Sequence, residues 1–178
     1  RVKISKEILD KAVNLKMVQR TGVGLDSLDL CELRKRNIPL YVNQGINAES
    51  VAEHTLLLML ACLRKLPVIH RNTANGIWKK QEQGVKTYEL AGKTICLVGM
   101  GSIAQTVVRL LKPFGVKIFY YDAFRKSENI EKDLGITYCG LNELFGKADI
   151  LSLHCPLTDD TRKVVNEKVI RAMAIGIS

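Results

Sequence analysis

One continuous stretch of the chain, TICLVGMGSIAQTVVRLLKPFGVKIFYYD from Thr94 to Asp122, constrains the fold more than any other. The apolar run over 95–98 predicts a strand that is covered on both faces of a sheet. A helix is expected over 102–114 and a second strand over 116–121, after which Asp122 closes the unit. Strand, glycine turn, helix, strand and acid in this order are typical of a dinucleotide-binding unit.

The turn between the first strand and the helix has the pattern G-x-G-x-x-A over 99–104. Gly99 permits a tight turn, Gly101 lets the backbone approach a pyrophosphate, and Ala104 lets the helix pack closely on the strand. The first N–H groups of the helix and the positive end of its dipole would face the phosphates. Asp122, which lies 21 positions after Gly101, is placed to accept hydrogen bonds from the adenosine ribose hydroxyls.

The acid also bears on the choice between NAD and NADP. A carboxylate at Asp122 would repel the 2′-phosphate of NADP, so the sequence favours NAD as the cofactor. Arg125 and Lys126 follow closely and would soften that preference. The alternative is an α/β domain whose first turn is glycine-rich by chance, and the complete order of elements argues against it.

Composition excludes several other classes of function. The net charge is +9, but the basic residues are scattered and do not alternate with aromatic ones, so we expect no nucleic-acid partner. The longest apolar run, 56–63, is too short to span a membrane. The five cysteines show no metal-ligand spacing, so we expect no metal site. Most of them stand in apolar surroundings, so we expect mostly buried thiols and a reducing, cytoplasmic compartment. Because the chain begins at Arg1 without a methionine, the absence of a signal peptide carries no weight.

The rest of the chain continues the alternation of helices and strands. Helices are expected over 5–14, 27–36, 47–66, 128–134, 141–145 and 166–173, and strands over 15–20, 38–42, 136–139, 150–154 and 175–178. This alternation predicts an α/β fold with a doubly wound parallel sheet of Rossmann type, incomplete at its C-terminal end. The helix over 47–66 is apolar nearly all round, so we expect it to be buried between domains or at a subunit interface. The segment over 78–92 is polar and is expected to be a connector.

Four motifs together resemble the D-isomer-specific 2-hydroxyacid dehydrogenases, which include phosphoglycerate dehydrogenase, D-lactate dehydrogenase, and glyoxylate and hydroxypyruvate reductases. They are RTGVGLDSLDL (20–30), NAESVAEHTLLLMLACLR (47–64), ELAGKTICLVGMGSIAQ (89–105) and ADILSLHCPLTDDTRKVVNEKVI (148–170). The resemblance implies that 1–46 is part of a flavodoxin-like substrate domain. It implies that 47–178 holds the interdomain helix and a truncated NAD-binding Rossmann domain.

The resemblance also implies roles for particular residues. Substrate-binding residues would be Val23 and Gly24, through their backbone N–H groups; the residues near the nicotinamide would be Val23, Ser50 and Val51; those at the pyrophosphate would be Ser102 and Ile103; and those on the adenosine side would be His154, Cys155 and Pro156. Each has a plainer interpretation. Gly24 would serve only a turn, His154 would act as a base, and Cys155 would be a nucleophile, although no partner base is evident in the sequence.

The catalytic arginine, acid and histidine of such enzymes would lie beyond Ser178, so no catalytic residue is assigned in this chain. The expected function is the NAD-dependent interconversion of a small D-2-hydroxy acid and a 2-oxo acid by hydride transfer, with these 178 residues inactive alone. An NADH-binding regulatory or scaffold module, like the corepressors related to the family, is the alternative. Oxidation of formate or phosphite on the same fold is a third. The resemblance further implies a homodimer, with the helix over 47–66 near its interface.

Overall fold

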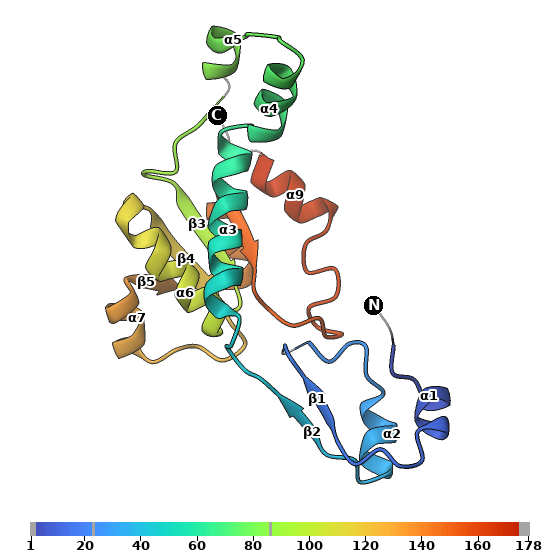
Figure 1. Ribbon diagram of the computed structural model, residues 1–178. Coiled ribbons are helices and arrows are strands. Elements are labelled where there is room, and N and C mark those ends of the chain that lie inside the picture. The colour runs from blue at the N-terminus through green and yellow to red at the C-terminus, as the bar shows by residue number, and fades with distance from the viewer. Residues whose placement is uncertain (1–2, 23, 86, 175–178) are drawn as a thin grey trace. The chain divides into compact units, whose positions relative to one another are not determined.

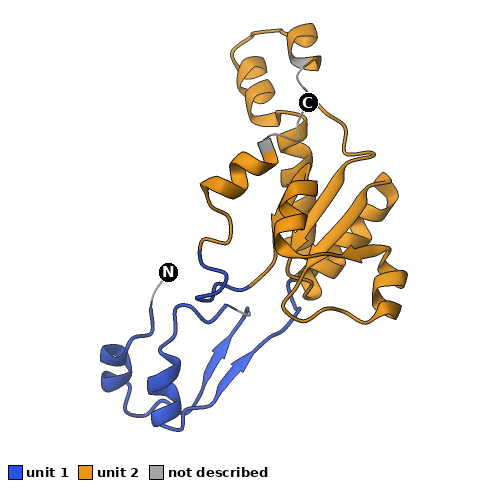
Figure 2. Cartoon of the chain, turned by 180° about the vertical axis from the view of Figure 1, so that it is seen from behind, with its two compact units in different colours: residues 1–47, 156–162 blue, residues 48–155, 163–178 orange. Residues whose placement is uncertain are grey.

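The structure is a computed structural model that describes residues 3–22, 24–85 and 87–174 (Figure 1). The chain forms two compact units (Figure 2). Unit 1 comprises residues 1–47 and 156–162, and unit 2 comprises residues 48–155 and 163–178. The strand expected over 175–178 lies outside the described residues, and the division into a substrate domain and an NAD-binding domain stays a prediction.

Unit 2 is built on a four-stranded sheet in which every pairing is parallel. Its strands are β3 (Thr94–Val98), β4 (Lys117–Tyr121), β5 (Ile136–Tyr138) and β6 (Ile150–Leu153), in the order β5-β4-β3-β6. Cys96 in the central β3 is paired with Phe119 on one side and Leu151 on the other. Residues 95–98 are buried because helices cover both faces of the sheet. The expected α/β class and parallel, doubly wound sheet are confirmed.

Two pairs of helices cover the sheet. On one face, α6 (Ser102–Leu111) and α3 (Ala48–Leu63) share a hydrophobic core with β3 and β4, and they lie alongside each other in Figure 1. On the other face, α8 (Leu141–Lys147) and α9 (Glu167–Ala174) pack together over the second set of strand side chains.

The expected helix over 102–114 is α6 followed by a short 3-10 turn, η1 (Lys112–Phe114), which ends at Gly115 with φ of 65°. The helix α7 (Glu128–Leu134) has the predicted bounds.

The long apolar helix expected over 47–66 is in fact shorter and is followed by a second helix. It ends at Leu63, and after Lys65, with φ of 51°, the helix α4 (Leu66–Ala74) begins with Pro67 in its first turn. Proline is favoured at this position because its missing N–H is not needed there. The expected connector contains a further short helix, α5 (Lys80–Gly84). Figure 1 shows α4 and α5 beyond the carboxyl end of α3.

The burial of the helix over 47–66 between domains or at a subunit interface stays a prediction, because within this chain α3 is covered only in part. Only Ala48, Ala52 and Met59 are buried in α3, whereas Leu57 and Leu58 are 53% and 52% exposed. The reason is that α3 packs against α6 along one face only. The opposite face therefore presents leucine side chains to solvent.

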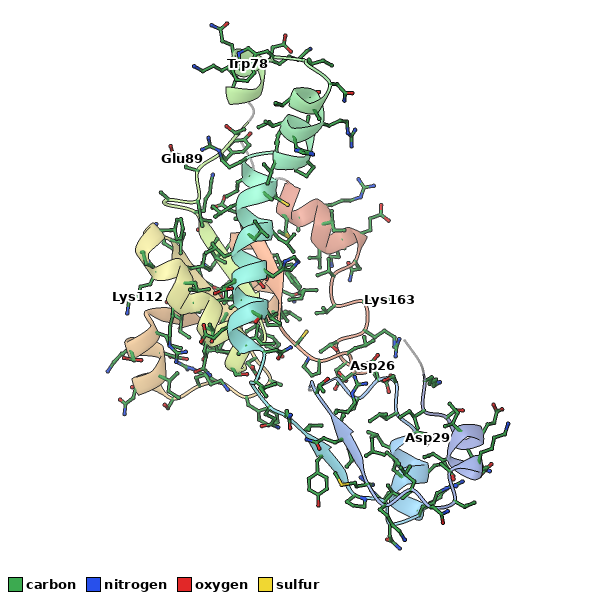
Figure 3. The ribbon with its side chains drawn as sticks, in the orientation of Figure 1. Asp26, Asp29, Trp78, Glu89, Lys112 and Lys163 are labelled. Carbon is green, nitrogen blue, oxygen red and sulfur yellow. The ribbon has the colours of Figure 1, made fainter. Side chains whose placement is uncertain are left out.

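Unit 1 is a smaller α/β unit. It contains α1 (Lys6–Lys11), β1 (Val18–Arg20), α2 (Leu30–Lys35) and β2 (Leu40–Val42), and the two strands are parallel. Leu9, Val18, Leu28 and Leu33 form its core. The helix expected over 27–36 begins three residues later because Asp29, labelled in Figure 3, caps it by accepting a hydrogen bond from the N–H of Glu32 at 3.0 Å. The helix expected over 5–14 ends at Lys11.

The five cysteines are all free thiols, but fewer are buried than expected. Cys96 and Cys139 are buried, Cys155 is half-buried, and Cys31 and Cys62 are exposed on their helices. Within the described ranges, none of the helices combines the length and apolar character that a membrane crossing requires. The same ranges hold no group of three or more His, Cys, Asp or Glu side chains suited to a metal ion.

Candidate functional site

The first glycine of the turn after β3 is required by the protein's own packing. Gly99 has φ of 95°, a conformation that residues with a side chain rarely adopt. A Cβ atom at Gly99 would lie 2.7 Å from the carbonyl carbon and oxygen of His154 and 2.8 Å from the backbone nitrogen of Cys155. Its N–H donates to the carbonyl of Tyr121 at 2.7 Å. Gly99 therefore lets the turns after β3 and β6 meet at the carboxyl edge of the sheet.

The second glycine has a different reason for its small size. Gly101 is the N-cap of α6, with φ of −76°, a conformation open to any residue. A Cβ atom there would meet nothing within 4 Å, so no protein group demands a glycine. Open space beside a helix N-terminus, where backbone N–H groups lack intrahelical partners, fits the close approach of a pyrophosphate. Ser102 is exposed and Ile103 half-buried in the first turn of the same helix.

Asp122 connects the carboxyl ends of β3 and β4. Its Oδ2 accepts a hydrogen bond from the N–H of the buried Met100 at 2.6 Å, and its Oδ1 accepts one from the N–H of Phe124 at 2.9 Å. Each carboxylate oxygen has a further lone pair, so both can still accept a bond from a ribose hydroxyl. The sequence did not predict the bond to Met100. It adds a structural role to the cofactor role expected for Asp122.

We expect Asp122→Asn to weaken NAD binding roughly tenfold and to lower the free energy of unfolding by about 1 kcal/mol. The amide NH₂ cannot accept, so one of the two backbone N–H groups loses its partner and the ribose loses an acceptor. Calorimetric titration with NAD and urea unfolding would measure both effects. Asp133→Asn, on the exposed surface of α7, is the charge-matched control. Unchanged NAD affinity in Asp122→Asn would leave Asp122 with a structural role alone.

His154 directly follows β6 and is held by two contacts. Its backbone N–H donates to the carbonyl of Val98 at 2.7 Å, and its Nε2 lies 2.9 Å from the Oγ of Ser152. Burial lowers the pKa of the imidazole below its usual value of 6.5, so the ring is neutral at pH 7. Burial also raises the pKa of the neighbouring Cys155 thiol, which argues against a thiolate nucleophile there.

The lowered pKa of His154 predicts a pH dependence of stability. Between the folded pKa and the unfolded value of about 6.5, the unfolded chain binds more protons than the folded one. The free energy of unfolding is therefore expected to fall as the pH drops below about 6.5. This change of unfolding free energy with pH should be smaller in His154→Gln. Urea unfolding at about pH 5 and about pH 7.5 measures the slope in both proteins. Equal slopes would show that His154 is not the group responsible.

A groove of about 620 Å³ in unit 2 brings two of the predicted residues together. Val51 on α3 and His154 after β6 both line it, and the edge strand β6 forms one of its walls. Ser50, the glycine turn and Asp122 are not among its lining residues. Ser50 is exposed near the start of α3. Apart from Ser50, the predicted cofactor residues of unit 2 thus lie in two features, the turns at the carboxyl edge of the sheet with the start of α6, and the groove beside β6.

The other predicted residues do not belong to unit 2 or are not described. Val23 lies outside the described residues. Gly24 is in the turn after β1 in unit 1, where a Cβ atom would lie 3.2 Å from Asp26 Oδ1. Pro156 is grouped with unit 1 as well. The roles assigned to all these residues, and to those of unit 2, stay predictions.

A parallel sheet with a glycine turn, an open helix N-terminus and an acid at the next strand end defines a dinucleotide-binding domain. In sequence, residues 56–177 match the NAD binding domain of the D-isomer specific 2-hydroxyacid dehydrogenases. The chain belongs to this family, and NAD is the cofactor of the matched domain.

Individual relatives agree with this assignment. The chain is 37% identical over 175 residues to a hydroxypyruvate reductase of Thermotoga maritima, covering 98% of this chain and 55% of that protein. A formate dehydrogenase from Granulicella m. superimposes with a TM-score of 0.90 at 32% identity, covering 96% of this chain and 46% of that one. A D-lactate dehydrogenase of Aquifex aeolicus, complexed with NAD and lactic acid, superimposes with a TM-score of 0.85 at 32% identity. The match covers 96% of this chain and 50% of that one. The chain spans about half the length of these relatives.

Proposed function

We propose that this chain is the cofactor-binding part of an NAD-dependent oxidoreductase that interconverts a D-2-hydroxy acid and a 2-oxo acid by hydride transfer. The observation that carries the proposal is the carboxyl edge of the sheet. There Gly99 closes the turn, Gly101 leaves open space at a helix N-terminus, and Asp122 retains free acceptor sites. These features suit the pyrophosphate and adenosine ribose of NAD.

The remaining roles follow from the resemblance to the family. In this proposal Gly101, Ser102 and Ile103 bind the pyrophosphate, and Asp122 binds the ribose. The adenosine side is bound by His154, Cys155 and Pro156, and the nicotinamide by Val23, Ser50 and Val51. The substrate carboxylate is bound by the N–H groups of Val23 and Gly24. The bound cofactor would supply the hydride acceptor, or as NADH the donor. In this proposal the residues named above bind and orient the cofactor and the substrate, and none of them is assigned as an acid–base catalyst.

Formate oxidation is a second candidate. It is favoured by the likeness to the formate dehydrogenase from Granulicella m., which has a TM-score of 0.90. Formate and 2-hydroxy acids share a carboxylate and a transferable hydride, so both are compatible with the same cofactor half. The substrate pocket separates the two candidates.

The test is a substrate screen with the full-length protein. NADH oxidation would be followed with glyoxylate, hydroxypyruvate and pyruvate, and NAD reduction with formate and with D- and L-lactate. We expect turnover of at least one 2-oxo acid and preference for the D-isomer in the reverse direction. Turnover of formate alone would select the second candidate. Binding of NADH without turnover of any substrate would instead support a regulatory or scaffold module.

We also propose a homodimer and a cytoplasmic location. The exposed leucines of α3 offer an apolar surface. The α4–α5 region adds a hollow of about 550 Å³ that Trp78 helps to line, and this side chain is 79% exposed. Figure 3 labels Trp78 at α5. Exposed apolar area of this kind marks interaction sites. Light scattering should give twice the mass of one full-length chain, and a monomer would contradict the proposal. Five free thiols suit a reducing compartment.

A further inference from the structure

The loop after Asp122 carries a cation, Arg125, three positions from the carboxylate. In dinucleotide-binding domains an acid at this place binds the ribose hydroxyls of NAD, whereas a nearby arginine accommodates the 2′-phosphate of NADP. The loop therefore holds groups with opposite consequences for cofactor choice. Which of them prevails depends on whether the guanidinium is free to meet a phosphate.

Arg125 is engaged by other groups of unit 2. Its Nε donates to Glu131 Oε1 and its Nη2 to Glu131 Oε2, both at 2.9 Å. Its guanidinium also lies over the ring of Tyr138, 5.2 Å from the centroid. A two-point pair with a carboxylate fixes the plane of a guanidinium, and the aromatic face below restricts it further. Arg125 is thus directed at helix α7 and strand β5.

Glu131 is itself held in place from the interior. Its side chain is only 11% exposed, and its Oε1 also accepts a hydrogen bond from the hydroxyl of the buried Tyr120 at 2.7 Å. That hydroxyl accepts a bond from the backbone N–H of Lys126 at 2.9 Å, which ties the end of the loop to the sheet. The bonds from Arg125 and Tyr120 lower the pKa of Glu131 to about 2, so it is ionised at neutral pH.

We propose that Glu131 is a specificity-determining residue of this cofactor site: by pairing with Arg125 it withholds that cation from a 2′-phosphate and leaves Asp122 to select NAD. For NADP to use Arg125, its phosphate must displace a two-point carboxylate partner. Glu131 would then remain nearly buried with only Tyr120, and the phosphate would add negative charge near Asp122 and Glu131. The proposal rests on the proposed cofactor site but not on the substrate.

The test compares NADPH and NADH binding to the full-length protein by fluorescence titration. Glu131→Gln keeps the shape of the side chain and removes its charge, so Arg125 loses its two-point ionic partner and is held by at most one neutral hydrogen bond. We expect the affinity for NADPH to rise roughly tenfold while that for NADH changes less than about twofold. The gain should shrink at high salt because it comes from a charge pair near the surface. An unchanged ratio of the two affinities, in a variant that still binds NADH, would overturn the proposal.

Three further variants separate this effect from a general change of charge or fold. The double variant Glu131→Gln/Arg125→Ala should lose the gain, and persistence of the gain would overturn the proposal. Glu143→Gln removes the same charge on α8, where Glu143 pairs with Lys147 at 3.3 Å, and should leave the ratio unchanged. Arg125→Ala alone should not raise the affinity for NADPH, because the cation is already withheld in the wild type and Glu131 keeps its charge. A wild-type protein that binds neither cofactor would contradict the proposed function itself.

Discussion

Gly99→Ala should lower the free energy of unfolding by about 3 kcal/mol. Part of the loss is backbone strain, because a residue with a Cβ is disfavoured at φ of 95° by roughly 1–3 kcal/mol. The rest is steric, since the added carbon would lie 2.7 Å from the backbone of His154, which has no flexible end to move aside. Urea unfolding monitored by circular dichroism would measure the change.

Gly115→Ala is the matched control for strain without crowding. Gly115 has φ of 65° and a Cβ atom there would meet nothing within 4 Å. We expect a loss of only about 1 kcal/mol in this variant. If the two variants were equally destabilised, the close approach of the turns after β3 and β6 would not be a constraint on the fold.

The second large effect is expected at Gly101 and concerns binding rather than stability. Gly101→Ala should weaken NAD binding by on the order of tenfold to a hundredfold, because the added methyl group would occupy the space proposed for the pyrophosphate. The fold should tolerate the change, since φ is −76° and no protein atom lies within 4 Å of the new Cβ. Calorimetric titration with NAD, together with urea unfolding, distinguishes the two effects.

Gly140→Ala controls for the effect of alanine at a helix N-cap. Gly140 is the N-cap of α8, with φ of −66° and open space around its Cβ position. Gly140→Ala should change the free energy of unfolding as little as Gly101→Ala does, and it should leave the affinity for NAD unchanged. Similar affinities in both variants and the wild type would contradict the assignment of the pyrophosphate to Gly101.

Much of unit 2 could be predicted because its signals are local. The apolar run of β3, the glycine turn and the acid after β4 are contiguous in sequence, and a parallel sheet brings the ends of β3 and β4 to one edge. The break between α3 and α4 was missed because Pro67 indicates the end of one helix and the start of the next equally well. The exposure of Leu57 within this chain could not be read from the sequence, because composition does not say which neighbour covers a helix face.

By itself the sequence determined the order of strands and helices, the parallel sheet of Rossmann type, the glycine turn and the acid that favours NAD. These depend on periodicity and on residues with special backbone or charge properties, which act over a few neighbouring positions. Only the tertiary structure decided why Gly99 must lack a side chain, that Asp122 also binds the N–H of Met100, and that Arg125 is paired with Glu131. Each of these is a contact between groups separated in the chain, and its geometry exists only once the sheet has aligned the strand ends.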